Sequence, residues 1–210
     1  ISLVKQAFLK QWRPLLESKK RPINPYRVIW DLMHAVDRKK TIVTHEAGSP
    51  RDQTIPFYEA IVPHGYIGWG KSTHLGFGIP LMIGAKMAYP DRFCLNLMGD
   101  GAFGMSGLDI ETSVRAGAPI TTVVLNNAGM ATYPENGTPS AYPTARELFG
   151  LTEMTGDYAQ IAEGMGAVGI TVTKPSEMGQ AVNDAQRHNL EGRTVLIDVH
   201  SDLESKKSKF

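Results

Sequence analysis

The chain has 210 residues, with 22 Lys and Arg against 21 Asp and Glu, which leaves a formal net charge of +1. This length is sufficient to bury a core, and 42% hydrophobic with 20% charged residues is the composition of a globular protein rather than a disordered or fibrous one. The balanced charge argues against a general nucleic-acid-binding protein, which needs surplus positive charge to neutralise phosphates.

The single cysteine, Cys94, excludes an internal disulfide and a metal site built from cysteines, and it favours a cytoplasmic location. No apolar run reaches the roughly 20 residues that a membrane helix needs. The chain starts at Ile1 rather than Met, so we expect a processed chain or a piece of a longer one.

The first elements predicted along the chain are a lead-in and then a well-capped helix. Pro14 and a basic cluster at 19–21 are expected to interrupt any long helix in residues 1–23. Asn24, followed by a proline at the first helical position, predicts the start of a helix that buries one apolar face as far as Val36.

In the rest of the chain, short β-branched runs alternate with segments of helical period, which is typical of repeated βαβ units. Strands are predicted at 41–44, 93–98, 120–125, 168–172 and 194–199. Helices are predicted at 76–88, 106–116, 157–165 and 176–188, with loops at 46–51 and 126–143. We therefore expect an α/β fold, a three-layer, doubly wound, mostly parallel sheet with helices on both faces. This domain is predicted to span 24–200, between the lead-in 1–23 and a solvated tail at 201–210.

Two polar motifs follow two successive predicted strands. Gly99-Asp100-Gly101 comes directly after one strand, and Asn126-Asn127 comes after the next, with 24 residues between the motifs. That length holds a helix and a strand, so the two strands can be parallel neighbours about 5 Å apart. Both motifs then emerge at the carboxyl edge of the sheet, where open α/β folds bind ligands.

The residue types indicate a ligand that is an anion held through a cation. Glycines let backbone N–H groups approach an anion, but the carboxylate of Asp100 would repel phosphate unless a metal ion lay between them. Asn127 adds an amide oxygen, and a backbone carbonyl of the following loop adds a third oxygen. An all-oxygen set favours Mg²⁺, or Ca²⁺, over zinc.

An alternative interpretation is a dinucleotide-binding oxidoreductase, because residues 99–104 also read G-x-G-x-x-G after a strand. That fold needs an acid at the end of the next strand to hold the ribose, and residues 118–128 contain none. The dinucleotide hypothesis is therefore less favoured, and a purely structural glycine turn less still.

With these motifs, the sequence resembles thiamine diphosphate enzymes such as acetolactate synthase, pyruvate oxidase and benzoylformate decarboxylase. Leu-Gly-Phe-Gly-Ile-Pro at 75–80 and Gly-Asp-Tyr-Ala-Gln-Ile-Ala at 156–162 are similar to two further segments of that family. The resemblance runs from about Pro25 to Val199 and covers only the family's C-terminal, diphosphate-binding domain.

The resemblance implies a role for particular residues at the diphosphate. Asp100, the Asn127 side chain and the Gly129 carbonyl would bind Mg²⁺. Beside Gly99, the backbone N–H groups of Gly101 and Ala102 would face the diphosphate.

Two further regions are matched by the resemblance. Leu75 would be the apolar residue under the bend of the cofactor, and the Thr73 carbonyl would accept from its amino group, so that both set the reactive conformation. Gly48 and Ser49 match the region that touches the far phosphate. His74, and His45 with its neighbour Glu46, could face a substrate, although structural roles are favoured for them.

The function implied is that of a thiamine diphosphate- and Mg²⁺-binding domain of an acetolactate synthase-like transferase or lyase. The full enzyme would decarboxylate a 2-oxo acid and transfer or protonate the resulting enamine. The activating Glu is expected on a pyrimidine-binding domain, in the same polypeptide or in a partner subunit of a naturally split decarboxylase. We expect a homo-oligomer with no nucleic acid or membrane partner, and an isolated chain that is inactive. A non-catalytic cofactor-binding module is the alternative of a different class.

Overall fold

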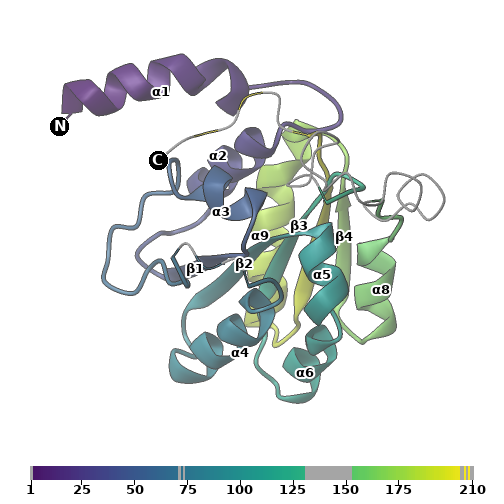
Figure 1. The fold of residues 1–210 in the computed structure, drawn as a ribbon. Coiled ribbons are helices and arrows are strands. Elements are labelled where there is room, and N and C mark those ends of the chain that lie inside the picture. The colour runs from purple at the N-terminus through teal and green to yellow at the C-terminus, as the bar shows by residue number, and fades with distance from the viewer. Residues whose placement is uncertain are drawn as a thin grey trace.

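A five-stranded parallel sheet forms the centre of the protein, with helices on both of its faces (Figure 1), so the predicted α/β fold is confirmed. The computed structural model describes residues 2–70, 72, 74–130, 153–203, 206 and 208. The strands are β1 (Thr41–His45), β2 (Phe93–Gly99), β3 (Thr121–Asn126), β4 (Val168–Val172) and β5 (Val195–His200). Their order in the sheet is β1-β2-β3-β5-β4.

The helices form one layer on each face because successive strand residues point to opposite sides. In β2, Leu95 and Leu97 pack in one apolar core, whereas Cys94 and Met98 pack in the other. The first core is covered by α1 (Ser2–Leu16), α2 (Pro25–Ala35) and α9 (Met178–Leu190). The second is covered by α4 (Gly78–Ala88), α5 (Asp100–Ser106), α6 (Asp109–Arg115) and α8 (Tyr158–Gly164). A short helix α3 (Ser49–Thr54) and a 3₁₀ turn η1 (Pro175–Glu177) complete the described elements.

Local capping explains why two helices start where the sequence predicts. The Asn24 side chain accepts a hydrogen bond from the Tyr26 N–H at 3.0 Å at the start of α2. The Asp157 side chain accepts from the Gln160 N–H at 3.0 Å at the start of α8. Each cap satisfies an N–H that has no acceptor inside its helix.

The expectation that Pro14 interrupts any long helix was wrong. The 15-residue helix α1 includes Pro14 close to its C-terminal end, where the proline removes one hydrogen bond of the helix. Burial of Trp12 against Tyr26 and Phe57, with ring centroids 4.9 and 5.2 Å apart, stabilises the helix from outside.

The tail at 201–210, predicted to be solvated, contains a residue that packs against the domain. Ser208 is buried, and its N–H donates to the Tyr26 hydroxyl at 2.9 Å. The domain boundaries at 23–24 and 200–201 stay predictions.

At the carboxyl edge of the sheet, the observed elements differ from the predicted ones in two places. The helix expected at 106–116 begins later, as α6 at Asp109, and a separate, unpredicted helix, α5, comes before it and begins at Asp100 directly after the extended Gly99. The Ser106 hydroxyl caps nothing among the described residues. The loop expected at 46–51 contains the start of α3. Within the loop predicted at 126–143, residues 131–143 lie outside the described part of the chain.

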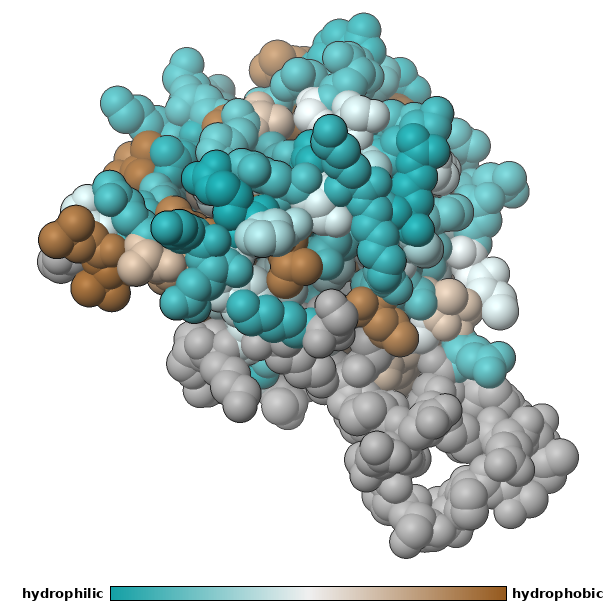
Figure 2. All heavy atoms as spheres, turned by 90° about the horizontal axis from the view of Figure 1, so that it is seen from above, coloured by the Kyte–Doolittle hydropathy of each residue, from teal (hydrophilic) through white to brown (hydrophobic). Residues whose placement is uncertain are grey.

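The surface is mostly hydrophilic on the face that Figure 2 shows, and apolar residues are scattered over it. Leu3 and Val4 of α1 are among the exposed apolar side chains. No helix among the described residues is long and apolar enough to span a membrane.

Candidate functional site

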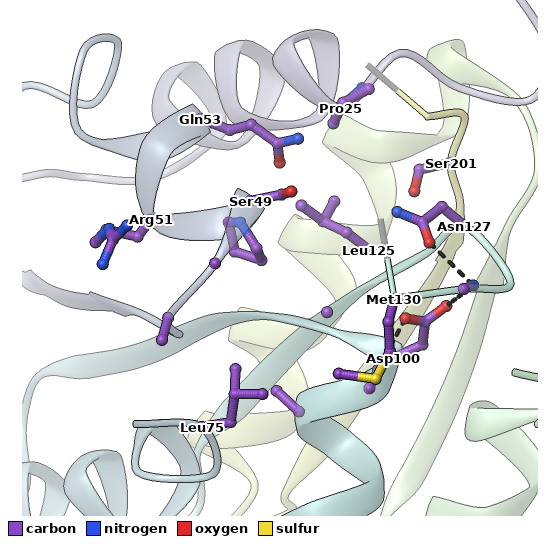
Figure 3. A pocket seen from close by; sticks show the side chains of 17 residues that line it. Pro25, Ser49, Arg51, Gln53, Leu75, Asp100, Leu125, Asn127, Met130 and Ser201 are labelled. Carbon is purple, nitrogen blue, oxygen red and sulfur yellow. Dashed lines mark hydrogen bonds between the residues drawn. The ribbon is translucent and has the colours of Figure 1, made fainter. Parts of the chain in front are cut away.

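A pocket of about 150 Å³ lies at the carboxyl edge of the sheet, beyond the ends of β1, β2 and β3 (Figure 3). All of the predicted cofactor residues that the structure describes line it, namely Gly48, Ser49, Leu75, Gly99, Asp100, Gly101, Ala102, Asn127 and Gly129. Thr73 lies outside the described residues. The structure therefore brings together residues from four separate stretches of the sequence, while their roles toward a cofactor stay predictions.

Asp100 is held by backbone donors at the first position of α5. Its Oδ1 accepts from the Gly101 N–H at 2.8 Å, and its Oδ2 accepts from the Gly129 N–H at 3.1 Å. Burial, with only 2% of the residue exposed, raises the pKa of the Asp100 carboxyl, and the N–H donors oppose this effect. A cation beside the carboxylate would favour its ionised form further.

Asn127 directs its amide oxygen to the same point. Asn127 Oδ1 accepts from the Gly129 N–H at 3.1 Å, so the side-chain oxygens of Asp100 and Asn127 converge on one backbone nitrogen, as the dashed lines in Figure 3 show. Ala128, in the turn from Asn127 to Gly129, lies in the left-handed region with φ of 58°. A carboxylate and an amide oxygen at one point are suitable ligands for a hard cation such as Mg²⁺.

The donor set fits an oxygen-liganded ion rather than a zinc site. No group of three or more His, Cys, Asp and Glu side chains gathers anywhere in the described ranges. A single carboxylate with one amide leaves the remaining positions of an octahedral ion to backbone carbonyls, water or phosphate oxygens. It is the Gly129 N–H, rather than its carbonyl, that contacts the Asp100 and Asn127 side chains, so the carbonyl ligand stays a prediction.

The walls of the pocket carry polar atoms that suit a polar ligand. The Gln53 Oε1 and the Ser201 Oγ are both buried and have no hydrogen-bond partner among the described residues. Gly101 allows Met130 to pack closely against this wall of the pocket, since a Cβ added at Gly101 would lie 3.2 Å from Met130 Cγ. The first N–H groups of α5 have no backbone acceptor within the helix, although the Gly101 N–H donates to Asp100 Oδ1, and they carry the partial positive charge of the helix.

Leu75 reaches the pocket from a different loop than the polar residues. It is half-buried, and Figure 3 places it apart from the Asp100 and Asn127 side chains. The pocket therefore has an oxygen-rich end and an apolar end, which suits a ligand with a charged tail and a less polar body.

Sequence reasoning missed several lining residues, among them Pro25, Arg51, Gln53 and Ser201. Arg51 and Gln53 belong to α3, which is too short to show a helical period. Ser201 comes beside Pro25 because Ile23 pairs with Ser201 in a parallel bridge. Arg51 is the one cationic side chain among the described lining residues, and its place in the loop at 46–51 was the only available signal.

His45 and Glu46 do not line this pocket. The His45 ring is buried against Tyr66 at 5.7 Å, and burial lowers the pKa of the imidazole. Glu46 is fully buried and binds backbone amides. The structural role that the sequence favoured for these two residues fits their surroundings. His74 is exposed and stacks on Trp69 at 5.7 Å.

The parallel sheet and its polar pocket define the class first, an α/β ligand-binding domain with its site at the carboxyl edge of the strands. The model of the family described as "Thiamine pyrophosphate enzyme, C-terminal TPP binding domain" matches residues 46–199, and the chain belongs to this family. The resemblance stated from the sequence is confirmed. The family match gives the dinucleotide hypothesis no support.

Curated relatives include enzymes with different reactions. The chain is 29% identical over 178 residues to the sulfoacetaldehyde acetyltransferase of Alcaligenes xylosoxydans xylosoxydans, covering 84% of this chain and 29% of that protein. It is 25% identical over 198 residues to the acetolactate synthase isozyme 3 large subunit of Escherichia coli K12, covering 92% of this chain and 34% of that protein. The chain thus spans about a third of the length of these relatives.

A solved structure shares the fold. The thiamine diphosphate-dependent 4-hydroxybenzoylformate decarboxylase of Rhodococcus jostii RHA1 superposes with a TM-score of 0.74 at 22% identity, over 88% of this chain and 33% of that one. The chain is therefore a thiamine diphosphate-binding domain of the type found at the C-terminus of thiamine diphosphate enzymes.

Proposed function

We propose that this domain binds thiamine diphosphate through a Mg²⁺ ion held by Asp100, Asn127 and the Gly129 carbonyl. The observation that carries the proposal is the convergence of the Asp100 and Asn127 oxygens on one point of the pocket. A diphosphate could not lie beside a buried carboxylate without a cation between them.

The other residues of the pocket are assigned by their position around that ion. The Ala102 N–H and the Gly101 N–H, which donates to Asp100 Oδ1 in this structure, would face the diphosphate from the start of α5, with Gly99 leaving room for its approach. Gly48 and Ser49 approach the far phosphate from the start of α3. Leu75 would support the bend of the cofactor at the apolar end, and the family resemblance assigns its amino group to the carbonyl of Thr73, which lies outside the described residues.

We further propose that the whole enzyme acts on a 2-oxo acid, as an acetolactate synthase-like transferase or lyase. When bound, thiamine diphosphate would supply a nucleophilic carbon and an electron sink for the decarboxylation of a 2-oxo acid. The residues of this chain would bind and orient the cofactor.

The chain supplies the diphosphate half of the active site in this proposal. A pyrimidine-binding domain, in the same polypeptide or on a partner subunit, would bring the activating Glu, and a homo-oligomer in the cytoplasm is the expected assembly. The share of the relatives that the chain covers, about a third, supports this division.

The substitution Asp100→Asn tests the metal-bridged site. It removes the negative charge and keeps the shape, so we expect thiamine diphosphate to bind at least about tenfold more weakly in Mg²⁺, by isothermal titration calorimetry. Asp109→Asn, an acid in the first turn of α6 that does not line the pocket, is the matched control and should bind as the wild type does. Unchanged affinity in Asp100→Asn would overturn the metal bridge. Thermal protection of the wild type by NADH instead of thiamine diphosphate would overturn the cofactor assignment.

A further inference from the structure

We propose that Glu46 is a positioning residue, whose buried carboxylate fixes the loop that carries Leu75 and so sets where Leu75 meets the cofactor. This inference rests on the proposed role of Leu75 and deepens it. Glu46 lines no part of the pocket, and it acts through the loop that does.

Glu46 sits at a rigid point of the fold. It follows the last residue of β1, is 0% exposed, and its own N–H donates to the Leu97 carbonyl of β2 at 2.8 Å. Its Oε2 accepts from the Gly76 N–H at 3.0 Å, and its Oε1 accepts from the Gly78 N–H at 2.5 Å. Gly76 and Gly78 are thus tied to the carboxyl end of the edge strand β1, and Leu75 is the immediate neighbour of Gly76.

Two glycines of the loop, Gly76 and Gly78, allow its backbone to approach this carboxylate. A Cβ added at Gly78 would lie 2.8 Å from Glu46 Oε1, and closer still to the Asn96 amide oxygen, so only glycine allows the approach. Gly76 has φ of 89°, a left-handed conformation that glycine adopts without strain, and its Cβ would lie 3.3 Å from Ser106 Cβ of α5. The backbone beside Leu75 is therefore confined between the end of β1 and the helix that carries Asp100.

The choice of a carboxylate is informative because burying one is expensive. No Lys or Arg forms an ion pair with Glu46 in the described part of the chain, and burial raises its pKa. What compensates the charge are backbone N–H groups, those of Gly76, Gly78 and Ala47, and Gly78 is the first residue of α4 at its positive end. A two-oxygen acceptor can hold both loop amides at once, which a hydroxyl or a single amide oxygen cannot do in this geometry.

A second contact ties the same loop from its other side. The Arg51 guanidinium, on α3, donates to the Ser72 carbonyl at 3.1 Å. Leu75 therefore lies between two attachments, Arg51 to Ser72 and Glu46 to Gly76, that both originate in residues 46–51. Residues 46–51, which include the predicted far-phosphate residues Gly48 and Ser49, thus also set the position of Leu75 at the other end of the pocket.

The substitution Glu46→Gln separates positioning from binding, in the holoenzyme with its pyrimidine-binding domain. An amide can accept through one oxygen only, so one loop N–H loses its partner while Asp100 and Asn127 are untouched. We expect the Kd for thiamine diphosphate in Mg²⁺ to stay within about threefold. We expect kcat, and the rate of deuterium exchange at the reacting carbon of the bound cofactor, to fall together by at least about tenfold.

A matched control is available at the start of α9. The carboxylate of Glu177 also accepts two backbone amides, those of Thr173 and Lys174 at 3.2 and 3.0 Å, both at Oε2, and it lies outside the pocket. Glu177→Gln makes the same chemical change and should leave cofactor affinity, kcat and carbon exchange unchanged. Hydrogen exchange of the Gly76 and Gly78 amides, followed by NMR, should be faster in Glu46→Gln and unaltered in Glu177→Gln.

The outcomes separate the two proposals. A wild-type enzyme that does not bind thiamine diphosphate would refute the proposed function. A wild type that binds, with Glu46→Gln exchanging its cofactor carbon at the wild-type rate or losing affinity and rate by one common factor, would refute the positioning role alone. If Glu46→Gln does not fold, Glu46→Asp keeps the carboxylate one bond further back, and the proposal requires the same split with a smaller loss of kcat.

Discussion

Cys94 illustrates how burial changes the chemistry of one residue. Its side chain is 0% exposed in β2, and burial raises the pKa of the thiol to about 11. Because the thiolate is the reactive form, the folded protein presents almost none of it at pH 8. The thiol is harder to ionise in the folded than in the unfolded chain. Its contribution to the free energy of unfolding therefore falls as the pH rises above about 8.5.

We therefore predict that Cys94 is unreactive toward an aromatic disulfide reagent in the native protein at pH 8. One equivalent of thiol should be released when the chain is unfolded in guanidinium chloride, as measured by absorbance. Cys94→Ser supplies the blank under both conditions. Rapid labelling of the native protein, without loss of secondary structure, would show that the strand opens or that the thiol is accessible.

Predictability at the residue scale depended on whether the signal was local. Asp100 and Asn127 were found because each directly follows a strand of recognisable composition. Gln53 and Ser201 were missed because neither has a local motif, and only folding brings their unpaired oxygens into the pocket.

At the scale of elements, Asp198 connects three of them. It is 1% exposed on β5, and its two oxygens accept from the Asn126 side chain at the end of β3 and from the Tyr158 N–H at the start of α8, both at 3.0 Å. This carboxylate therefore anchors the element that directly precedes Asn127. Its removal would leave the buried Tyr158 N–H without its acceptor and the Asn126 side chain with only the Gly156 carbonyl, at 3.5 Å.

We predict that Asp198→Ala lowers the free energy of unfolding by about 3 kcal/mol, from urea denaturation followed by circular dichroism. Asp184→Ala on α9, which removes a surface pair with Arg187 at 2.9 Å, is the control and should cost less than about 1 kcal/mol. Similar losses in the two variants would mean that the Asp198 network contributes no more than a surface ion pair.

Helices with local caps were predictable and helices stabilised by distant contacts were not. Asn24 and Asp157 cap α2 and α8 through neighbours two and three residues away, so their sequence context is sufficient. In α1, the packing of Trp12 on Tyr26 and Phe57 outweighs the unfavourable Pro14, and no local pattern contains that information.

For the whole molecule, the domain is one part of a larger catalytic arrangement in our proposal. We predict that the chain alone binds thiamine diphosphate and Mg²⁺, with a rise in thermal midpoint on addition of both, yet shows no release of CO₂ from pyruvate. Addition of the pyrimidine-binding domain should restore turnover. If thiamine diphosphate bound only when that domain was present, the predicted affinity of the chain alone would be wrong. Turnover by the chain alone, absent from a parallel Asp100→Asn preparation, would refute the half-site proposal.

The sequence by itself determined the α/β class, most of the strands and helices, and the pairing of Gly-Asp-Gly with Asn-Asn, because these depend on residues that are neighbours along the chain. The tertiary structure decided the strand order β1-β2-β3-β5-β4, the start of α5 at Asp100 and the membership of Ser201 in the pocket. It also decided that Glu46 turns inward to hold the loop of Leu75. The physical reason is that burial and hydrogen bonding between distant segments set these features, and their energies exceed the local preferences that a sequence pattern records.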